Sequence, residues 1–412
     1  ERSKICATFT PSLISERKRR DEIISVPMIQ STLKRSLDCP DPDPDSQRAK
    51  APRSTLNLRP KSGSPLLMLS LEEVGCRLYS PGEDMIYETK SDFSGYRFLA
   101  NSGKWFLAVD SRSKLVIVDV FSEERIDLPP LESIKGGRCK FEVAGDQKFK
   151  VRLINDTVFF SSAMVEDVED LRGLLWVDDK NGDYVVVWQF ECSEFVGYCK
   201  KGDDHYREIN TRKGPRLELQ GLCDMVLKGY SLYVLTKRDF IRHLDLSGGQ
   251  DGFKDVSENH RLPMWTPCLS TKEEYERLRA IKLISSTNSI AVTTSGEVLY
   301  VRSNAYETST LERPRTFRVF KRDPKDLHPS TYDTRLVEVD SLGDEALILD
   351  LGFTVKVGIE PNSIYFTRGD RILHNKVSCL DMCVYNLATK TIKRFPGLSN
   401  LKVKDAQWFL PS

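Results

Sequence analysis

The sequence lacks the features by which several large classes of protein are recognised. No run of eighteen apolar residues occurs, so no transmembrane helix is predicted. Neither sign of charge dominates, because 61 Lys+Arg stand against 60 Asp+Glu in 412 residues. A net charge of +1 provides no global field that would attract a nucleic acid or an anionic membrane. We therefore expect neither a nucleic acid nor a membrane among the partners.

Paired cysteines are also missing. The ten cysteines are spaced singly, and none forms a C-x-x-C pair. Cys379 and Cys383 are close together but lack a second pair or suitably spaced histidines, so we predict no metal site. We interpret the cysteines as reduced core residues of an intracellular protein, which favours the cytoplasm or the nucleus. Because the chain begins at Glu1 rather than Met, we expect further residues upstream, and an organelle signal there would change this localisation.

The sequence contains none of the common catalytic motifs: G-x-S-x-G, H-E-x-x-H, G-x-x-x-x-G-K-[ST] and G-x-G-x-x-G are all absent. The five histidines are scattered. His205 stands beside Asp203 and Asp204, an arrangement that could bind a metal but that a hairpin turn explains equally well. His243 lies in an apolar run and is expected to be a core or hydrogen-bonded strand residue. We predict no catalytic residue and no cofactor, and we do not expect an enzyme.

The first 63 residues differ in composition from the rest. They are rich in proline and contain neither Trp nor Tyr. The run DCPDPDPDSQRAKAPRS cannot hold a helix or a central strand, because proline removes amide donors and restricts its neighbours. We expect residues 1–35 to be weakly helical and residues 36–63 to form a disordered linker.

From residue 64 onwards, short runs rich in Val, Ile, Tyr and Phe recur between turn residues. Runs of this length and composition are typical of strands rather than helices. One helix start is predicted, at the capping box in STKEEYERLRA. The predicted strands are KWFLAV, LVIVDV, DTVFFSS, DYVVVWQF, EFVGYC, YSLYVLT, SIAVTT, EVLYVR, FRVFKR, ALILDL, NSIYFT and MCVYNL.

Several stretches far apart in the chain repeat one pattern. LVIVDVFSEERIDLPPL at 115–131 and DMCVYNLATKTIKRFPGL at 381–398 both consist of an apolar run, a polar turn, a second short run and a proline. Approximate, kelch-like repeats of antiparallel strands predict a β-propeller, in which each blade buries its faces against its neighbours. The chain is therefore predicted to be all-β, with a six- or seven-bladed β-propeller over 64–412. The two stretches would be equivalent hairpins of its first and last blades, and four further stretches would be inner hairpins: 104–120, 227–246, 295–323 and 361–387.

The same repeats resemble the plant F-box-associated KIB-type β-propeller family. The resemblance covers roughly residues 65–400 and is most specific at Ser341-Leu342-Gly343-Asp344, Asn362-Ser363-Ile364-Tyr365-Phe366 and Val384-Tyr385-Asn386-Leu387. It implies a substrate receptor of a cullin-based ubiquitin ligase. In such a receptor the propeller holds an unknown target protein, and an F-box binds a Skp-type adaptor.

The N-terminal residues depart from the family pattern. No Leu-Pro-led set of short helices is visible, and ERSKICATFTPSL resembles only the closing helix of an F-box, with Phe9 where Trp is usual. In the entry segment SPLLMLS, Leu67 replaces another Trp. Either an F-box lies upstream of Glu1, in which case the adaptor is a partner, or the F-box has decayed.

Three functions therefore stay open: a ligase receptor, a stand-alone propeller scaffold that has lost its F-box, and a propeller enzyme acting at the central channel. The residues we predict to contact a target protein are Trp265, in the proline-flanked loop RLPMWTPCLS, and its neighbours His260 and Arg261. Trp105 and Trp188 are expected in the core. Ser341–Asp344 is expected to be a turn in which Gly343 supplies a positive φ and Asp344 caps.

Overall fold

The computed structural model describes most of the chain from Ser64 onwards. The described residues are 64–71, 75–89, 91–136, 139–145, 148–153, 163–190, 195–211, 221–237, 240–248, 252–257, 282–307, 315–323, 325, 336–356, 359–371, 378–398 and 401–411. The expected N-terminal segments 1–35 and 36–63, the predicted strand 156–162 and the predicted helix start at 270–280 lie outside these residues. The other eleven predicted strand runs coincide with strands.

The described strands form six blades, counted in the described part of the chain. Four are separate four-stranded antiparallel sheets, and the other two share one nine-stranded sheet. Blade 1 joins the two ends of the chain and contains β28 (Val403–Phe409), β1 (Leu66–Leu71), β2 (Cys76–Ser80) and β3 (Met85–Glu88). Blade 2 contains β4 (Tyr96–Ser102), β5 (Trp105–Asp110), β6 (Leu115–Asp119) and β7 (Arg125–Asp127). Blade 3 contains β11 (Leu171–Asp178), β12 (Asp183–Phe190), β13 (Phe195–Lys200) and β14 (Arg207–Asn210).

The remaining blades follow in chain order. Blade 4 contains β15 (Asp224–Lys228), β16 (Ser231–Leu235), β17 (Ile241–Asp245) and β18 (Lys254–Asp255). Blade 5 contains β19 (Lys282–Val292), β20 (Val298–Glu307), β21 (Arg315–Arg322) and β22 (Leu336–Glu338). Blade 6 has five strands in the order β24 (Phe353–Val355), β23 (Ala346–Ile348), β25 (Ser363–Arg371), β26 (Ser378–Asn386) and β27 (Thr391–Lys393). Blades 5 and 6 share the nine-stranded sheet, in which β19 pairs with β24, and β23 with β25, in parallel.

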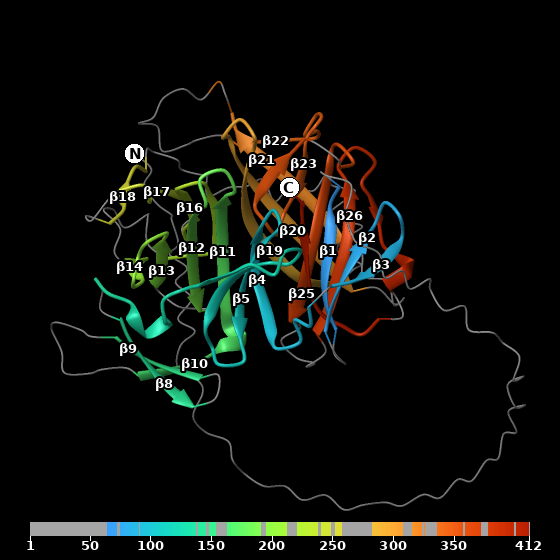
Figure 1. Ribbon diagram of the computed structural model, residues 1–412. Coiled ribbons are helices and arrows are strands. Elements are labelled where there is room, and N and C mark those ends of the chain that lie inside the picture. Colours follow the sequence, from blue (N-terminus) through green and yellow to red (C-terminus); the bar gives the residue numbers. More distant parts are fainter. Residues whose placement is uncertain are drawn as a thin grey trace, which may run out of the picture. The chain divides into compact units, whose positions relative to one another are not determined.

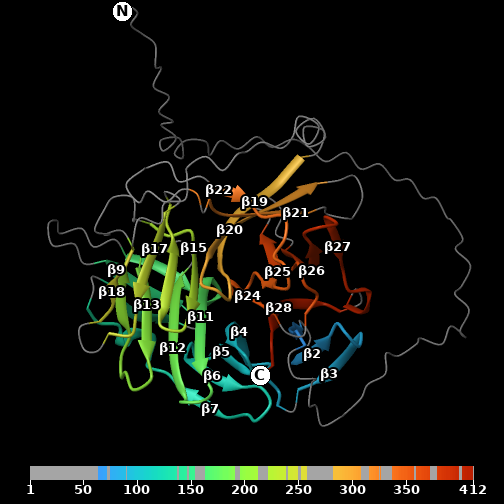
Figure 2. The ribbon, with the colours of Figure 1, turned by 90° about the horizontal axis from the view of Figure 1, so that it is seen from above.

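The blades close into a ring around their innermost strands. β4 contacts β11, β11 contacts β15, β15 contacts β19, and β24 pairs with β19. β25 and β4 both contact β28, which completes the circle (Figure 2). The all-β propeller prediction is confirmed, and its described part has six blades. The described helices are short 3-10 turns, η1 (Leu131–Ser133), η2 (Val168–Asp170) and η4 (Pro396–Leu398), and none is long enough to cross a membrane.

The ring is closed by strands from opposite ends of the chain. β28 pairs with β1 in an antiparallel ladder that runs from Leu66 opposite Phe409 to Leu71 opposite Val403. Trp408 and Phe409 are fully buried, and Trp408 packs edge-on against Tyr365 of blade 6. Each face of a blade is apolar and is covered by the next blade, so this ladder completes the last interface.

The two repeated stretches occupy equivalent places in their blades, as predicted. The expectation that the first stretch belongs to the first blade is wrong, because β1, β2 and β3 form a blade with β28 before it. Residues 115–131 form β6, β7 and η1, and residues 381–398 contain most of β26 together with β27 and η4. The four longer hairpins lie in the interior of their sheets, as predicted: three are the two middle strands of four-stranded blades, and the hairpin at 361–387 forms the third and fourth of the five strands of blade 6.

The residue that ends β6 or β26 caps the turn that follows the strand: Asp119 accepts from the amides of Phe121 and Ser122, and Asn386 accepts from those of Ala388 and Thr389. A short acceptor side chain at this position holds the turn tight.

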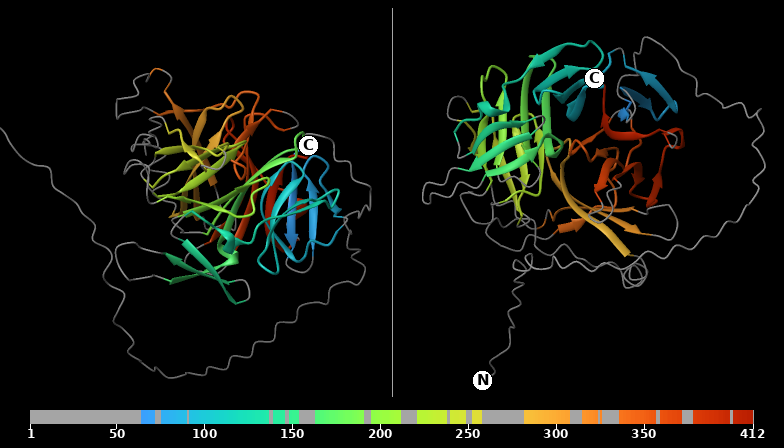
Figure 3. Two further views of the ribbon diagram at one scale, coloured as in Figure 1. Left: turned by 60° about the vertical axis from the view of Figure 1, so that its left-hand side comes forward. Right: turned by 90° about the horizontal axis from the view of Figure 1, so that it is seen from below.

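A separate three-stranded sheet lies between blades 2 and 3 in the sequence. It contains β8 (Cys139–Gly145), β9 (Lys148–Leu153) and β10 (Ala163–Asp167), in the order β10-β9-β8, and lies at the lower left of Figure 1, below the ring. The same sheet hangs below the blades in the left view of Figure 3. Its buried side chains, Phe141, Phe149 and Val151, join the aromatic cluster around Trp188 of blade 3.

Candidate functional site

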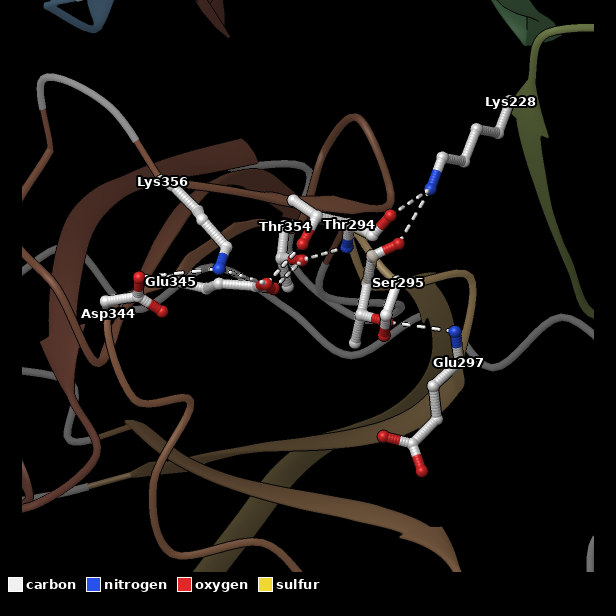
Figure 4. Close-up of polar contacts among 9 residues, drawn as sticks. Lys228, Thr294, Ser295, Glu297, Asp344, Glu345, Thr354 and Lys356 are labelled. Atoms are coloured by element: carbon white, nitrogen blue, oxygen red, sulfur yellow. Dashed lines mark hydrogen bonds and ion pairs between the residues drawn. The ribbon is translucent and has the colours of Figure 1, made fainter.

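A network of charged and hydroxyl side chains links three successive blades at the end of the ring where β19 turns into β20 (Figure 4). Blade 4 contributes Lys228, the last residue of β15. Blade 5 contributes the turn at 293–297, which joins β19 to β20. Blade 6 contributes Asp344 and Glu345, just before β23, together with β24 and the lysine that follows it. This network is hereafter called the turn-end network: Lys228, Thr293, Thr294, Ser295, Glu297, Asp344, Glu345, Thr354 and Lys356.

Glu345 is the hub of the turn-end network. Its two carboxylate oxygens accept hydrogen bonds from the hydroxyls of Thr294 and Thr354. The amide of Thr294 in turn donates to Thr354 Oγ1 at 2.9 Å. Burial alone would raise the pKa of Glu345, but these hydrogen bonds and Lys356 outweigh it, so the pKa is lowered. Glu345 is therefore a structural carboxylate that stays ionised, not a general acid.

The two lysines of the network differ in their roles. Lys228 Nζ donates to the carbonyl of Thr293 at 2.7 Å and to that of Thr294 at 3.3 Å, which ties blade 4 to blade 5. Lys356 Nζ lies 3.4 Å from Asp344 Oδ2 and 3.8 Å from Glu345 Oε1. The side chains of Asp344 and Lys356 are 76% and 51% exposed, so this ion pair faces solvent. The hydroxyls of Thr294 and Thr354 and the carboxylate of Glu345 are thus hydrogen-bonded to one another inside the network, whereas Asp344 and Lys356 form a charged rim that faces solvent.

The side chains of the turn-end network are suited to hydrogen bonding and ion pairing. The network holds no histidine or cysteine, and within the residues that the structure describes no three His, Cys, Asp or Glu side chains gather as a metal site would require. The charged rim on a rigid scaffold is typical of a contact surface for another molecule.

The central channel was the place for a catalytic site under the enzyme hypothesis. A pocket there has about 20 Å³ for the centres of water molecules, enough for on the order of one ordered water. It is lined by Ala100, Asn101, Leu174, Leu175, Leu227, Asp350, Leu351 and Phe353. Asp350 already accepts from the amide and hydroxyl of Thr367, and Asn101 Nδ2 donates to the carbonyl of Trp408. A pocket with room for about one ordered water gives the enzyme hypothesis no support.

The predicted contact residues His260, Arg261 and Trp265 lie outside the described residues. The nearest described strands on either side are β18 and β19, and the segment between them joins blade 4 to blade 5. Their role therefore stays a prediction.

The other tryptophans behave as expected. Trp188 is fully buried, and Trp105 is 7% exposed and donates its indole N–H to Asp179 Oδ1 at 2.6 Å. The expectation that the cysteines belong to the core is confirmed for Cys76, Cys199 and Cys383 and is wrong for Cys223, which is exposed.

Both candidate histidines have structural explanations. Asp203 accepts from the amide of Lys200 at 2.9 Å and from Arg207 Nη2 at 2.9 Å, so it belongs to the hairpin turn between β13 and β14. These contacts favour the hairpin turn over a metal site as the explanation of the residues around His205. His243 stacks on Tyr233 with ring centroids 4.4 Å apart, and its amide donates to Ser257 Oγ. Burial lowers the pKa of His243, which favours its neutral form.

The segment Ser341–Asp344 is a turn, as predicted, with Gly343 at φ +66°. The assignment of its cap is wrong. Ser341 Oγ accepts from the amide of Gly343, and Asn362 Oδ1 accepts from that of Leu342, whereas Asp344 points to Lys356. Asp344 pairs with the exposed Lys356 instead of capping the turn, and Asn362, twenty positions from Leu342, supplies the cap.

No local sequence pattern predicts the turn-end network. Thr294, Thr354 and Lys356 are polar residues at strand ends, a common pattern on any sheet. Only the ring brings them together, because β24 pairs parallel to β19 through Val292 and Phe353.

Comparison with known proteins places this fold in a family. The model of the KIB1-4 beta-propeller family matches residues 78–386, and the chain belongs to that family. F-box protein At5g25290 of Arabidopsis thaliana is 47% identical over 360 residues, which cover 85% of this chain and 86% of that protein. F-box protein KIB4 of the same plant is 34% identical over 352 residues, covering 82% and 80%. The resemblance noted from the sequence is confirmed, whereas the description of the repeats as kelch-like has no support.

Solved structures resemble the chain only distantly. Apo AztD from Citrobacter koseri is 11% identical with a TM-score of 0.28, covering 81% of this chain and 94% of that one. The beta-propeller domain of Cps50 (Swd1) from Myceliophteria thermophila is 10% identical with a TM-score of 0.26, covering 70% and 88%. Similarities this low carry no argument about function.

Proposed function

We propose that the protein is a substrate-recognition subunit of a cullin-based ubiquitin ligase and that its propeller binds a target protein. One observation carries the proposal: relatives that share the propeller over most of their length are named F-box proteins. An F-box binds a Skp-type adaptor, which leaves the propeller available for the target. The turn-end network fits a binding role, since its rim is charged while its interior is satisfied. A receptor of this kind works in the cytoplasm or the nucleus.

The target-binding residues that we propose are Trp265, His260 and Arg261. Tryptophan and arginine dominate the energetics of protein interfaces, and loops on a rigid scaffold carry recognition. The turn-end network is a second candidate contact surface, because Asp344 and Lys356 are exposed on a rigid turn.

The proposal is tested by capturing proteins from plant extract with the full-length chain while the proteasome is inhibited. Proteins that bind the wild type and are lost with Trp265→Ala are candidate targets, and they should carry more ubiquitin when the wild type is overproduced. Asp204→Ala, at the side chain that is 85% exposed in the β13–β14 turn, is the matched control and should retain them. Capture without any change in ubiquitin would instead support the scaffold that has lost its F-box.

A further inference from the structure

The outer face of the β8–β9–β10 sheet carries an excess of positive charge. Side chains alternate between the two faces of a strand. Phe141, Phe149 and Val151 point into the core, so their neighbours along each strand point outwards. The outward-facing charged residues are Lys140, Glu142, Lys148, Lys150, Arg152 and Asp167.

The charges on this face are not balanced within the sheet. Lys140 lies directly opposite Arg152, and Lys150 lies directly opposite Glu142. Arg152 Nη2 also reaches Glu142 Oε2, at 3.3 Å. One carboxylate therefore serves three cations. Like charges in directly opposed positions destabilise a sheet, and a bound anion would relieve the repulsion.

Two further observations indicate that this face has a partner. Arg152 Nε is buried and has no hydrogen-bond acceptor among the described residues. Val165, opposite Lys150 on this face, is 63% exposed. Among the described residues, the one other large hydrophobic side chain that is comparably exposed is Val143, which lies opposite Phe149 on the other face of the sheet. A contact here would combine charge pairing with apolar burial, as protein interfaces do.

We infer that this face of the β8–β9–β10 sheet, hereafter the basic face, binds an acidic segment of a partner protein. The inference names the chemistry of a partner and rests on the proposed function of the propeller as a binding module. The contact is made by side chains on the face and not by strand addition to β8, because Lys140 and the bulge between Val143 and Gly145 protect that edge.

A nucleic acid fits the basic face less well. Sheets that bind single strands stack bases on exposed aromatic rings, and the two phenylalanines of this sheet, Phe141 and Phe149, are buried on its other side. Glu142 and Asp167 also stand among the cations and would repel a continuous phosphate backbone. A peptide that alternates acidic and apolar residues matches this mixture of charges with Val165.

The test measures binding of a fluorescein-labelled decaglutamate peptide to the full-length chain by fluorescence anisotropy at low salt. The triple variant Lys140→Glu, Lys148→Glu, Lys150→Glu should weaken binding at least tenfold. The control variant Lys114→Glu, Lys180→Glu, Lys393→Glu makes the same change of net charge at exposed positions elsewhere and should change binding less than twofold. Equal weakening by both variants would overturn the inference, as would no binding by the wild type.

Two further arms complete the test. A decameric single-stranded DNA that binds the basic face more tightly than the peptide would make it a nucleic-acid site and contradict the inference. The milder variant Lys140→Gln, Lys148→Gln, Lys150→Gln covers the case in which the charge reversals impair folding, and it should still weaken binding several-fold. All of these substitutions lie in the propeller, whereas the proposed adaptor contact is made by an F-box. Loss of peptide binding therefore bears on the inference alone, and failure of the wild type to bind an adaptor bears on the proposed function.

Discussion

Asn362 Oδ1 accepts a hydrogen bond from the amide of Leu342 at 2.8 Å, across twenty residues of sequence. The backbone of Asn362 completes the junction: its amide donates to the carbonyl of Glu345 at 2.8 Å, and its carbonyl accepts from Leu387 at 3.0 Å. The three sequence segments most specific to the family, Ser341–Asp344, Asn362–Phe366 and Val384–Leu387, therefore meet at one residue. The family pattern in this region encodes a structural junction of blade 6.

Replacing Asn362 should destabilise this junction. Asn362 has φ +56°, a conformation that Asn tolerates better than other non-glycine residues. Asn362→Ala loses the hydrogen bond and strains the backbone, so we expect a loss of about 1–3 kcal/mol in the free energy of unfolding. The free energy is measured by urea denaturation.

The controls for Asn362 separate the two causes. Asn362→Gly removes the hydrogen bond, but glycine adopts the positive φ without strain, so this variant should lose less stability than Asn362→Ala. Asn362→Asp keeps an acceptor and should cost least. Equal stability of the Ala variant and the wild type would contradict the assigned role.

Glu345 should make stability depend on pH in the acidic range. A glutamate in the unfolded chain has a pKa of about 4.3, and the folded-state pKa of Glu345 is lowered. The folded protein therefore binds fewer protons, so this stabilisation is complete above about pH 4.3 and is lost as the pH falls through the folded pKa. Glu345→Gln lacks it at every pH.

We therefore expect the difference in unfolding free energy between wild type and Glu345→Gln to be constant at neutral pH and to shrink below about pH 4.3. Chemical denaturation at a series of pH values measures it. Thr354→Val, which removes one hydrogen bond to the carboxylate, should move the change towards higher pH. A difference that did not vary with pH would show that the charge of Glu345 is not stabilising.

Lys104 and Asp119 form a partly buried ion pair in blade 2. Lys104 Nζ lies 2.9 Å from Asp119 Oδ2, and the aspartate side chain is 1% exposed. Lys104→Met leaves a buried carboxylate without its cation, and we expect a loss of about 1–3 kcal/mol of unfolding free energy. The double variant Lys104→Met, Asp119→Asn removes the charge as well and should recover part of the loss. If the double variant were less stable than the single one, buried charge would not be the cause.

Gly197 gives a test of core packing in blade 3. It lies directly opposite Trp188, and a Cβ at this position would stand 2.4 Å from Cε2 of the indole ring. Gly197→Ala should therefore displace a fully buried ring and cost about 1–3 kcal/mol. Gly82→Ala is the control, since a Cβ there meets nothing within 4 Å. The melting temperatures of both variants check the expectation, and a Gly197→Ala variant as stable as Gly82→Ala would contradict it.

The sequence predicted what depends on local pattern. Continuous apolar runs identified the middle strands of the blades, such as β5 and β12, because these strands are buried on both faces. The equivalence of the two hairpins was visible in the sequence from the turn residue that they share, Asp119 in blade 2 and Asn386 in blade 6.

Features that depend on long-range pairing were not predictable in this way. The ladder between β28 and β1 joins residues more than three hundred positions apart. β8, β9 and β10 went unrecognised because charged residues interrupt their apolar residues: Lys and Glu in β8, Lys and Arg in β9, and Glu and Asp in β10. The turn-end network needs the ring itself to bring Thr294 to Glu345.

The most direct test of the proposed receptor function is binding to a Skp-type adaptor. The protein translated from the first codon of its gene and a shortened chain beginning at Ser64 are each passed over the immobilised adaptor. We expect the longer protein to be retained and the shortened one to be lost, because under the proposed function an F-box that precedes the propeller makes the contact with the adaptor. If neither protein is retained while both are folded, the receptor function is contradicted and the chain is a propeller scaffold without a working F-box.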